Sequence, residues 1–305
     1  MDRFTPAYLK TSDSGLLDRK IEQAEAILRD CRLCPRECRV NRMDGQTGVC
    51  RTGRQAKVAD SCCHRGEEFC ISGSRGSGTI FFSRCSLLCL FCQNYEISHE
   101  GEGREVSAGL LAGMMLDLQN RGCHNINFVT PTHVVPQILS ALGKAVEGGL
   151  RIPLVYNSGG YDSVETLELL DGIVDIYMPD FKFLNPDFAE ETCGAPDYPD
   201  AAKSALREMF RQVGDLVLGR DGTARRGLLV RHLVMPGQLE DTRKILRFIH
   251  DDISPETYVN LMSQYHPSGT AWQMRGISRP LSRSEFRQAL DIAAEEGIRR
   301  LDRLF

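Results

Sequence analysis

Short apolar runs alternate with longer amphipathic stretches from Thr79 onward, and this alternation limits the possible folds more than any other feature. The apolar runs are TIFFS, INFVT, IPLVYN, VDIYM, LLVRHLVM and TYVNLM. Helical periodicity follows each run, over residues 107–121, 135–147, 161–170, around 200–213, after Gly237, and over 282–296. Continuous apolar strands separated by helices are typical of a parallel sheet that helices cover.

Right-handed crossovers between such units allow two α/β architectures, an open doubly wound sheet or a curved, partial barrel. In both architectures the chemistry lies at the carboxyl ends of the strands. We therefore expect functional residues directly after the apolar runs.

The cysteines divide the chain into two regions. Ten of the twelve lie between Cys31 and Cys92. Residues 1–77 are rich in cysteine, glycine, arginine and other charged residues, and they show little apolar periodicity. We predict a loop-rich, Cys-rich N-terminal extension held by a metal site, followed by an α/β domain over residues 78–305.

Composition and the first residues narrow the class of protein. A net charge of -4 argues against a nucleic-acid partner bound by phosphate neutralisation. The N-terminus lacks the pattern of a secretory signal, and no apolar run approaches the roughly 20 residues that cross a membrane. We expect a cytoplasmic protein without a membrane partner. A reducing cytosol disfavours disulfides, so the cysteines indicate metal or cluster ligation.

A three-cysteine set follows the first apolar run after only Ser83 and Arg84, with the spacing Cys85-x3-Cys89-x2-Cys92. Three thiolates can hold three corners of a [4Fe-4S] cluster and leave the fourth iron without a protein ligand. A structural zinc site would need a fourth ligand, and the next downstream candidate lies seven residues beyond the set.

This stretch resembles the Cys-x3-Cys-x-aromatic-Cys motif of the radical S-adenosylmethionine (SAM) superfamily, at Cys85, Cys89, Phe91 and Cys92. The resemblance extends from about residue 73 to the end, and it implies a partial (β/α)6 barrel. In that superfamily the open iron chelates the methionyl amine and carboxylate of SAM. One electron then cleaves a carbon-sulfur bond, and the resulting 5′-deoxyadenosyl radical abstracts hydrogen. The resemblance places Phe91 near the adenine; the alternative is a core aromatic residue.

More closely, the chain resembles uncharacterised relatives of the pyruvate formate-lyase activating enzyme. The likeness rests on GSRGSGTIFF, CQNYEIS, NFVTPTH, VYNSGGY, MPDFKF, VRHLVMPG and NLMSQYHP. It implies an oxidoreductase that takes hydrogen from a glycine of a partner protein, another peptide or a small molecule. A flavodoxin or ferredoxin is the implied electron donor.

Two departures from the activating enzymes stand out. The residue before the first thiol is often glycine in those relatives, so that a required positive φ would strain Arg84. Only 14 residues separate Cys92 from the helix near Ser107, too few for the ferredoxin-like insert of many activating enzymes.

Polar residues after the second and third strands are candidate SAM contacts. Thr130 and Thr132 stand where activating enzymes carry Gly-Gly-Glu, which contacts the SAM amine; Thr132 could instead be a helix N-cap. Asn157 and Ser158 precede two glycines and suit a ribose or carboxylate contact, and a capped glycine turn is the alternative.

Charged residues after the fourth strand and within the fifth complete the candidate SAM site. Alternation places Asp180 and Lys182 on one face, and the pair resembles the Asp-x-Lys motif of activating enzymes. An ordinary ion pair is the alternative. Arg231 lies in an apolar run and is a candidate partner for a SAM carboxylate. His232 is more typical of a satisfied core histidine. We assign no catalytic hydrogen or proton carrier.

The N-terminal cysteines predict a second metal site. The four candidate ligands are Cys31, Cys34, Cys38 and Cys50, which suit structural zinc or a closed iron-sulfur cluster. Three further thiols could contribute instead: Cys62, Cys63 and Cys70. A competing functional class therefore remains, a non-catalytic iron-sulfur protein for electron transfer or cluster assembly.

Overall fold

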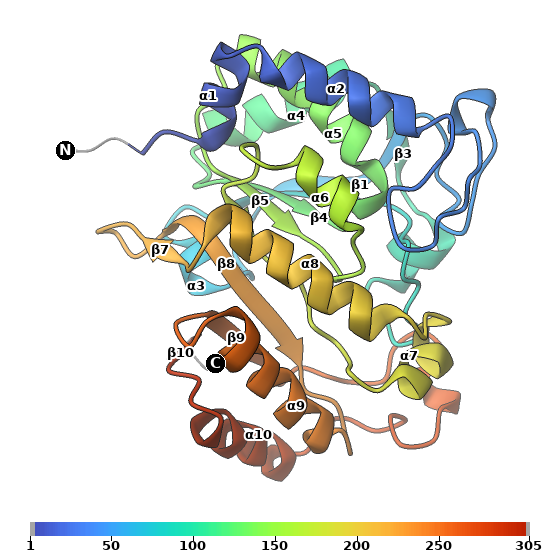
Figure 1. Ribbon diagram of the computed structural model, residues 1–305, viewed down its shortest axis with the longest axis vertical. Coiled ribbons are helices and arrows are strands. Elements are labelled where there is room, and N and C mark those ends of the chain that lie inside the picture. Colours follow the sequence, from blue (N-terminus) through green and yellow to red (C-terminus); the bar gives the residue numbers. More distant parts are fainter. Residues whose placement is uncertain (1–3, 303–305) are drawn as a thin grey trace.

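A computed structural model describes residues 4–302 and shows a curved, mostly parallel sheet with helices packed on its outer side (Figure 1). Six parallel strands form its centre: β2 (Ser77–Phe82), β4 (Ile126–Val129), β5 (Leu154–Asn157), β6 (Ile176–Tyr177), β8 (Ala224–Leu233) and β9 (Tyr258–Met262). These strands are the six predicted apolar runs. The predicted partial (β/α)6 barrel is therefore confirmed.

Further strands extend both edges of this sheet. On one edge, β10 (Arg300–Leu301) pairs parallel with β9. On the other edge, β1 (Ala56–His64) pairs antiparallel with both β2 and β3 (Arg104–Val106). The two-residue strand β7 (Val217–Leu218) pairs antiparallel with β8 and lies outside this strand order.

The predicted helices are present with small shifts at their ends. Their bounds are α4 (Ala108–Asn120), α5 (Val135–Glu147), α6 (Val164–Leu169), α8 (Tyr198–Val213), α9 (Leu239–Phe248) and α10 (Arg283–Glu295). Ser107 caps α4, because its hydroxyl accepts from the Leu110 amide. Helix α6 begins after residue 163 instead of at 161, because the buried Asp162 accepts hydrogen bonds in the preceding turn. An unpredicted helix, α7 (Pro186–Cys193), begins at the cap residue Asn185.

The N-terminal extension contains more regular structure than expected. Helices α1 (Ala7–Asp13), α2 (Leu16–Ile27) and α3 (Phe69–Ser72) lie in it, together with β1. The expectation of a loop-rich segment is thus wrong for most of the extension. It holds for residues 28–55, which are loop apart from a short 3-10 turn (Arg42–Asp44). Helix α2 packs on α5 through a short apolar face. This face could not be recognised in the sequence, because the charged residues of α2 outnumber its buried ones.

Helix α1 covers the barrel at the amino ends of two strands. Tyr8 is fully buried, and its hydroxyl donates to the carbonyl of Ile152, which lies two residues before β5. The Thr11 hydroxyl donates to the carbonyl of Gly172, four residues before β6. These contacts tie residues 7–13 to the end of the barrel opposite the predicted chemistry. The proposed domain boundary between residues 77 and 78 stays a prediction.

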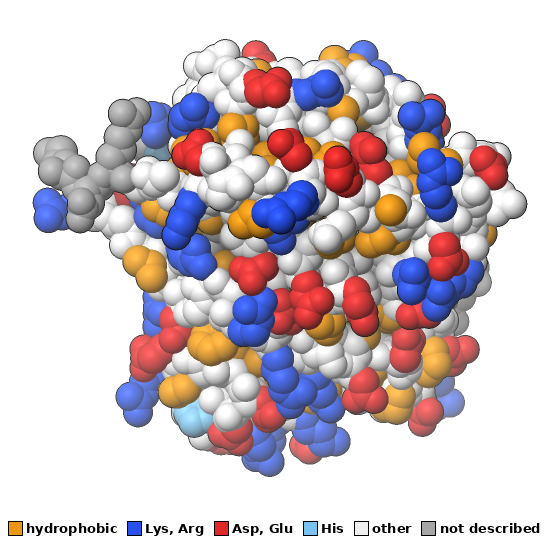
Figure 2. Space-filling model, turned by 45° about the horizontal axis from the view of Figure 1, so that its top comes forward, with side chains coloured by type: hydrophobic (Ala, Val, Ile, Leu, Met, Phe, Trp, Pro, Cys, Tyr) orange, Lys and Arg blue, Asp and Glu red, His pale blue; other side chains and the backbone are white. Residues whose placement is uncertain are grey.

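Two observations concern the molecular surface. On the face drawn in Figure 2, lysine and arginine side chains are interspersed with aspartate and glutamate. Over residues 4–302, no helix combines the length and the apolar character needed to cross a membrane.

Replacing Tyr8 tests whether α1 is part of the barrel's core. We expect Tyr8→Ala to lower the free energy of unfolding by about 3–5 kcal/mol, because it leaves a cavity in place of a buried ring. Tyr8→Phe removes only one hydrogen bond and should cost about 1 kcal/mol. Chemical denaturation under anaerobic conditions measures both. Wild-type stability in Tyr8→Ala would contradict an integral role for α1.

Candidate functional site

The predicted three-cysteine set lies on the loop that leaves β2 at its carboxyl end. The Leu87 amide donates to the Cys85 sulfur at 3.4 Å, and the Ser98 hydroxyl donates to the Cys92 sulfur at 3.2 Å. Burial, followed by repulsion from Cys89 and Cys92, raises the pKa of Cys85 to about 12. Cys89 is buried, and Cys85 and Cys92 are half-buried. Neighbouring thiols in such a setting are costly as bare thiolates, whereas a cationic metal centre stabilises them in that form. The set therefore fits a metal cluster.

Each thiolate of a [4Fe-4S] cluster binds a different iron, so its ligands surround the cluster instead of converging on one point. Within residues 4–302, no three His, Cys, Asp or Glu side chains form a group suited to a single metal ion.

Left-handed backbone conformations shape the cysteine loop. Arg84 has a φ of 74° and Leu88 a φ of 57°, immediately before Cys85 and Cys89. The positive φ foreseen at Arg84 is thus present, although a side chain in this region costs on the order of 1–3 kcal/mol. The Arg84 guanidinium donates to the His99 carbonyl at 2.6 Å and its amide donates to Ile97. These hydrogen bonds hold the conformation in place of a glycine.

Phe91 is buried in an aromatic group beside the cysteine loop. Its ring packs edge-on against Phe183 at 5.8 Å between centroids and lies 6.3 Å from Tyr265. This packing agrees with the alternative of a core aromatic residue. The proposed contact with adenine stays a prediction.

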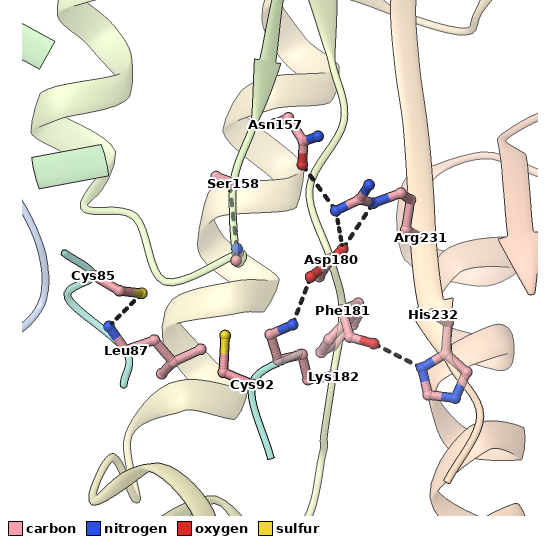
Figure 3. Close-up of polar contacts among 12 residues, drawn as sticks. Cys85, Leu87, Cys92, Asn157, Ser158, Asp180, Phe181, Lys182, Arg231 and His232 are labelled. Carbon is pink, nitrogen blue, oxygen red and sulfur yellow. Dashed lines mark hydrogen bonds and ion pairs between the residues drawn. The ribbon is translucent and has the colours of Figure 1, made fainter. Parts of the chain in front are cut away.

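Charged side chains and one amide, from three neighbouring strands and the segment after one of them, meet next to this loop (Figure 3). The carboxylate of Asp180 accepts from Arg231 at 2.8 Å and from the Lys182 ammonium at 2.5 Å. Arg231 also donates to the side-chain oxygen of Asn157 at 2.8 Å, and its guanidinium lies 3.8 Å from Glu67. The structure thus brings together four of the predicted site residues and adds Glu67.

Electrostatics favour the charged forms of Asp180 and Lys182. Burial opposes the charge of Asp180, but Arg231 and Lys182 hold the pKa of that carboxyl below its usual value. Burial likewise opposes the charge of Lys182, but Asp180 and then Cys89 raise the pKa of the ammonium. Lys182 therefore lies within electrostatic reach of both the acidic network and the cysteine loop. An anionic ligand beside Cys89 would meet a fixed positive charge.

The predicted hydroxyl contacts converge on a buried carboxylate that the sequence did not single out. Asp162 accepts from Thr132 at 2.7 Å, from Tyr156 at 2.8 Å and from Ser158 at 2.6 Å. Thr132 belongs to a 3-10 turn and makes no capping hydrogen bond, so the N-cap alternative is wrong. Thr130 has a φ of 59°, a strained value for a β-branched residue. Contacts of these hydroxyls with SAM stay predictions.

Two histidines near the strand ends are neutral and buried. Both ring nitrogens of His232 have partners, the Phe181 carbonyl at 2.7 Å and the Thr242 hydroxyl at 2.9 Å. Burial lowers its pKa to about 4, which confirms the expected core histidine. His133 hydrogen-bonds the Ser83 carbonyl, and burial also lowers its pKa to about 4.

A cavity of about 300 Å³ opens at the carboxyl end of β9, beside the charged network. It is lined by Glu67, Glu68, Arg231, Asn260 and Gln264, among others. The two glutamates could not be found from local sequence pattern, because they precede α3 and reach the site across more than 160 residues of chain.

Cys193 is a second residue that sequence reasoning missed. It ends α7, and its thiol lies near that of Cys89 and influences its pKa. The Thr192 carbonyl accepts from the amide of Leu90, which fixes the end of α7 against the cysteine loop. A lone cysteine carries no signal for this contact in the sequence.

The N-terminal cysteines separate into two groups. Cys31, Cys34, Cys38 and Cys50 line one small cavity at the side of the barrel. Cys62 and Cys63 lie on β1, and Cys70 lies in α3. The metal at the four-cysteine set stays a prediction.

Substituting Cys193 tests whether Cys89 or Cys193 is the cluster ligand. We expect Cys193→Ala to keep the SAM-dependent change in the electron paramagnetic resonance (EPR) spectrum of the reduced protein, because the motif cysteine Cys89 holds the iron. Cys89→Ala should lose that change. The reverse pattern would make Cys193 the ligand.

Glu67 gives a pH-dependent prediction. Burial raises the pKa of Glu67 to about 7, despite the opposing effect of Arg231. Because the folded-state pKa exceeds the unfolded one, the wild-type protein loses stability as the pH rises from about 4.5 to about 7. Glu67→Gln lacks this loss, so its stability relative to wild type should rise by on the order of 1–3 kcal/mol between pH 5 and pH 8. A pH-independent difference, measured by anaerobic denaturation, would contradict this assignment.

One protein family and several known proteins resemble this chain. The family model of the radical SAM superfamily matches residues 79–249, more than half of the chain. An uncharacterised protein of Methanocaldococcus jannaschii is 33% identical over 306 residues, which cover 97% of this chain and 84% of that protein. Among solved structures, methylornithine synthase (PylB) has a TM-score of 0.48 at 16% identity, over 74% of this chain and 63% of its own. SuiB of Streptococcus suis has a TM-score of 0.43 at 12% identity, over 70% of this chain and 44% of its own. The chain belongs to the radical SAM superfamily, whose members carry a [4Fe-4S] cluster and SAM.

Proposed function

We propose that this protein is a radical SAM enzyme of the activating-enzyme type, which abstracts hydrogen from a glycine of a partner protein. The observation that carries the proposal is the network of Asp180, Lys182, Arg231 and Asn157, which adjoins Cys89. It matches the Asp-x-Lys element that relates this sequence to activating enzymes. The proposed SAM contacts are Phe91, Thr130, Thr132, Asn157, Ser158, Asp180, Lys182 and Arg231.

The proposed roles follow from charge and position. When bound at Cys85, Cys89 and Cys92, a [4Fe-4S] cluster supplies the one electron that splits SAM into methionine and a 5′-deoxyadenosyl radical. Lys182 and Arg231 provide positive charge for the SAM carboxylate, and Asp180 keeps both side chains oriented. Asn157 is the candidate for a ribose hydroxyl. A protein substrate would reach this site at the open carboxyl end of the strands, next to the cavity beside β9.

The electron donor proposed for this enzyme is a flavodoxin or ferredoxin. Its single electron, together with SAM and a substrate C–H bond, gives methionine, 5′-deoxyadenosine and a substrate radical. The balance requires one electron for each SAM cleaved. A glycine is a suitable substrate because a radical at its α-carbon is stabilised by both neighbouring amides.

Anaerobic protein with dithionite and SAM should release 5′-deoxyadenosine. We expect Lys182→Met to reduce this release by at least about tenfold, because a charge-assisted contact to SAM is lost. Lys203→Met is the matched control, since Lys203 pairs only loosely with Asp200 on α8, 3.8 Å away. Release in Cys89→Ala would contradict the assignment of the three cysteines as cluster ligands. No release from the wild-type protein with its cluster intact would favour the non-catalytic iron-sulfur alternative.

The glycine substrate has its own test. The enzyme is incubated with cell extract whose proteins carry glycine deuterated at the α-carbon, and the mass of the released 5′-deoxyadenosine is measured. We expect the mass to increase by one deuterium. An extract labelled with deuterated alanine is the control. Deuterium transfer from alanine, or from neither label, would contradict a glycine substrate.

A further inference from the structure

The N-terminal thiols repeat the spacing of the radical SAM loop in reverse. Cys31-x2-Cys34-x3-Cys38 mirrors Cys85-x3-Cys89-x2-Cys92, and Cys50 adds a distant fourth thiol. Iron-sulfur proteins commonly use three closely spaced cysteines and one distant one, whereas structural zinc sites commonly group their ligands in two pairs. The three-plus-one pattern favours a cluster with all four irons ligated.

The fold brings these four thiols together. All four line the same small cavity. The Val49 amide donates to the Cys38 sulfur at 3.4 Å. Amide hydrogen bonds of this kind are typical of cluster ligands and tune the cluster's potential.

A buried arginine faces the same cavity. Arg42 is only 1% exposed, and its guanidinium lies 3.9 Å from the Cys31 sulfur. Two of its nitrogens donate to the carbonyls of Gly53 and His133. Its third nitrogen is buried and has no hydrogen-bond partner within residues 4–302. A buried cation with a free donor requires an anion nearby, and a cluster with four thiolates is one.

Backbone strain marks both cysteine sets in the same way. Six non-glycine residues of the described chain have a positive φ, and all but Thr130 adjoin a cysteine of one set or the other. The five are Glu37, Arg39, Arg51, Arg84 and Leu88. In addition, a side-chain carbon added at Gly48 would lie 2.5 Å from the Cys38 sulfur. The N-terminal loop is thus shaped around its sulfurs as closely as the radical SAM loop is.

The N-terminal cysteine loop contacts the radical SAM loop directly. Ser86, which follows Cys85 in the chain, lines the four-thiol cavity. Arg36 from the N-terminal loop donates to the Ser86 carbonyl at 3.1 Å, to the Leu87 carbonyl at 3.3 Å and to the Cys193 carbonyl at 2.7 Å. Because consecutive Cα atoms are about 3.8 Å apart, a cluster in this cavity would lie close to the one at Cys85.

We propose that Cys31, Cys34, Cys38 and Cys50 hold a second [4Fe-4S] cluster that relays electrons to the radical SAM cluster. A flavodoxin-type or ferredoxin-type donor reduces the second cluster by one electron, and the second cluster then reduces the first by one electron. This relay rests on the proposed function, whereas the presence of the cluster does not. Arg42 compensates the negative charge, and Arg36 fixes the two loops at a constant separation.

Metal content of three proteins tests the site. Anaerobic wild-type protein should hold about eight iron atoms per chain and no zinc. The triple variant Cys85→Ala, Cys89→Ala and Cys92→Ala should keep about four irons, in a cluster whose EPR spectrum does not respond to SAM. The double variant Cys34→Ala and Cys38→Ala should also keep about four, in a cluster that does respond.

Either of two results would overturn the second cluster. One is wild-type protein with only about four irons, with or without one zinc ion; the other is a triple variant without iron. Eight irons without any SAM cleavage would refute the proposed enzyme and leave the second cluster intact. The relay has a separate test. Flavodoxin should reduce the remaining cluster of the double variant at least tenfold more slowly than it reduces the same cluster in the wild-type protein. An unchanged rate would exclude the relay.

Two glycine substitutions provide a test that leaves every cysteine in place. Gly48→Ala should lose the second cluster, because the added methyl group overlaps Cys38. Gly53→Ala is the matched control in the same loop, since its added methyl group meets no atom within 4 Å. Equal iron content in the two variants would contradict the assignment.

Discussion

The grouping of three neighbouring thiols, one buried and two half-buried, at the end of β2 is the constraint on which the rest of the site depends. Burial and mutual repulsion raise the pKa of Cys85 to about 12, so a bare trio of thiolates is unfavourable at neutral pH. A cluster with positive irons removes that cost, and three ligands leave one iron free. This arrangement requires left-handed backbone conformations at Arg84 and Leu88, which are strained and which hydrogen bonds and packing must hold in place.

The parallel sheet explains why the charged network lies beside that loop. Strands β5, β6 and β8 are neighbours, and their carboxyl ends place Asn157, Asp180 and Arg231 side by side. An isolated parallel bridge between Asp180 and Arg231 continues this pairing beyond the end of β6. Lys182 then extends the network towards Cys89. The position of these charges is thus a consequence of strand order and not of local sequence.

The parts of the fold that depend on local pattern could be predicted, because six apolar runs, each followed by a helical period, permit few topologies. The cysteine loop and the shared face of Asp180 and Lys182 are local in the same sense. Contacts between distant segments could not be predicted. Glu67 reaches Arg231, Cys193 reaches Cys89, and Arg36 reaches the loop after β2 only once the chain has folded. Helix α2 was missed for another reason, since its charged residues outnumber its buried ones.

The central claim is that the chain leaves one iron of its cluster for SAM to bind. Electron-nuclear double resonance on the reduced protein, with SAM labelled by ¹⁵N at its amine and ¹⁷O at its carboxylate, tests this most directly. The account predicts hyperfine coupling from both labels to the cluster at Cys85, Cys89 and Cys92. A reduced cluster that shows neither coupling at saturating SAM would contradict it.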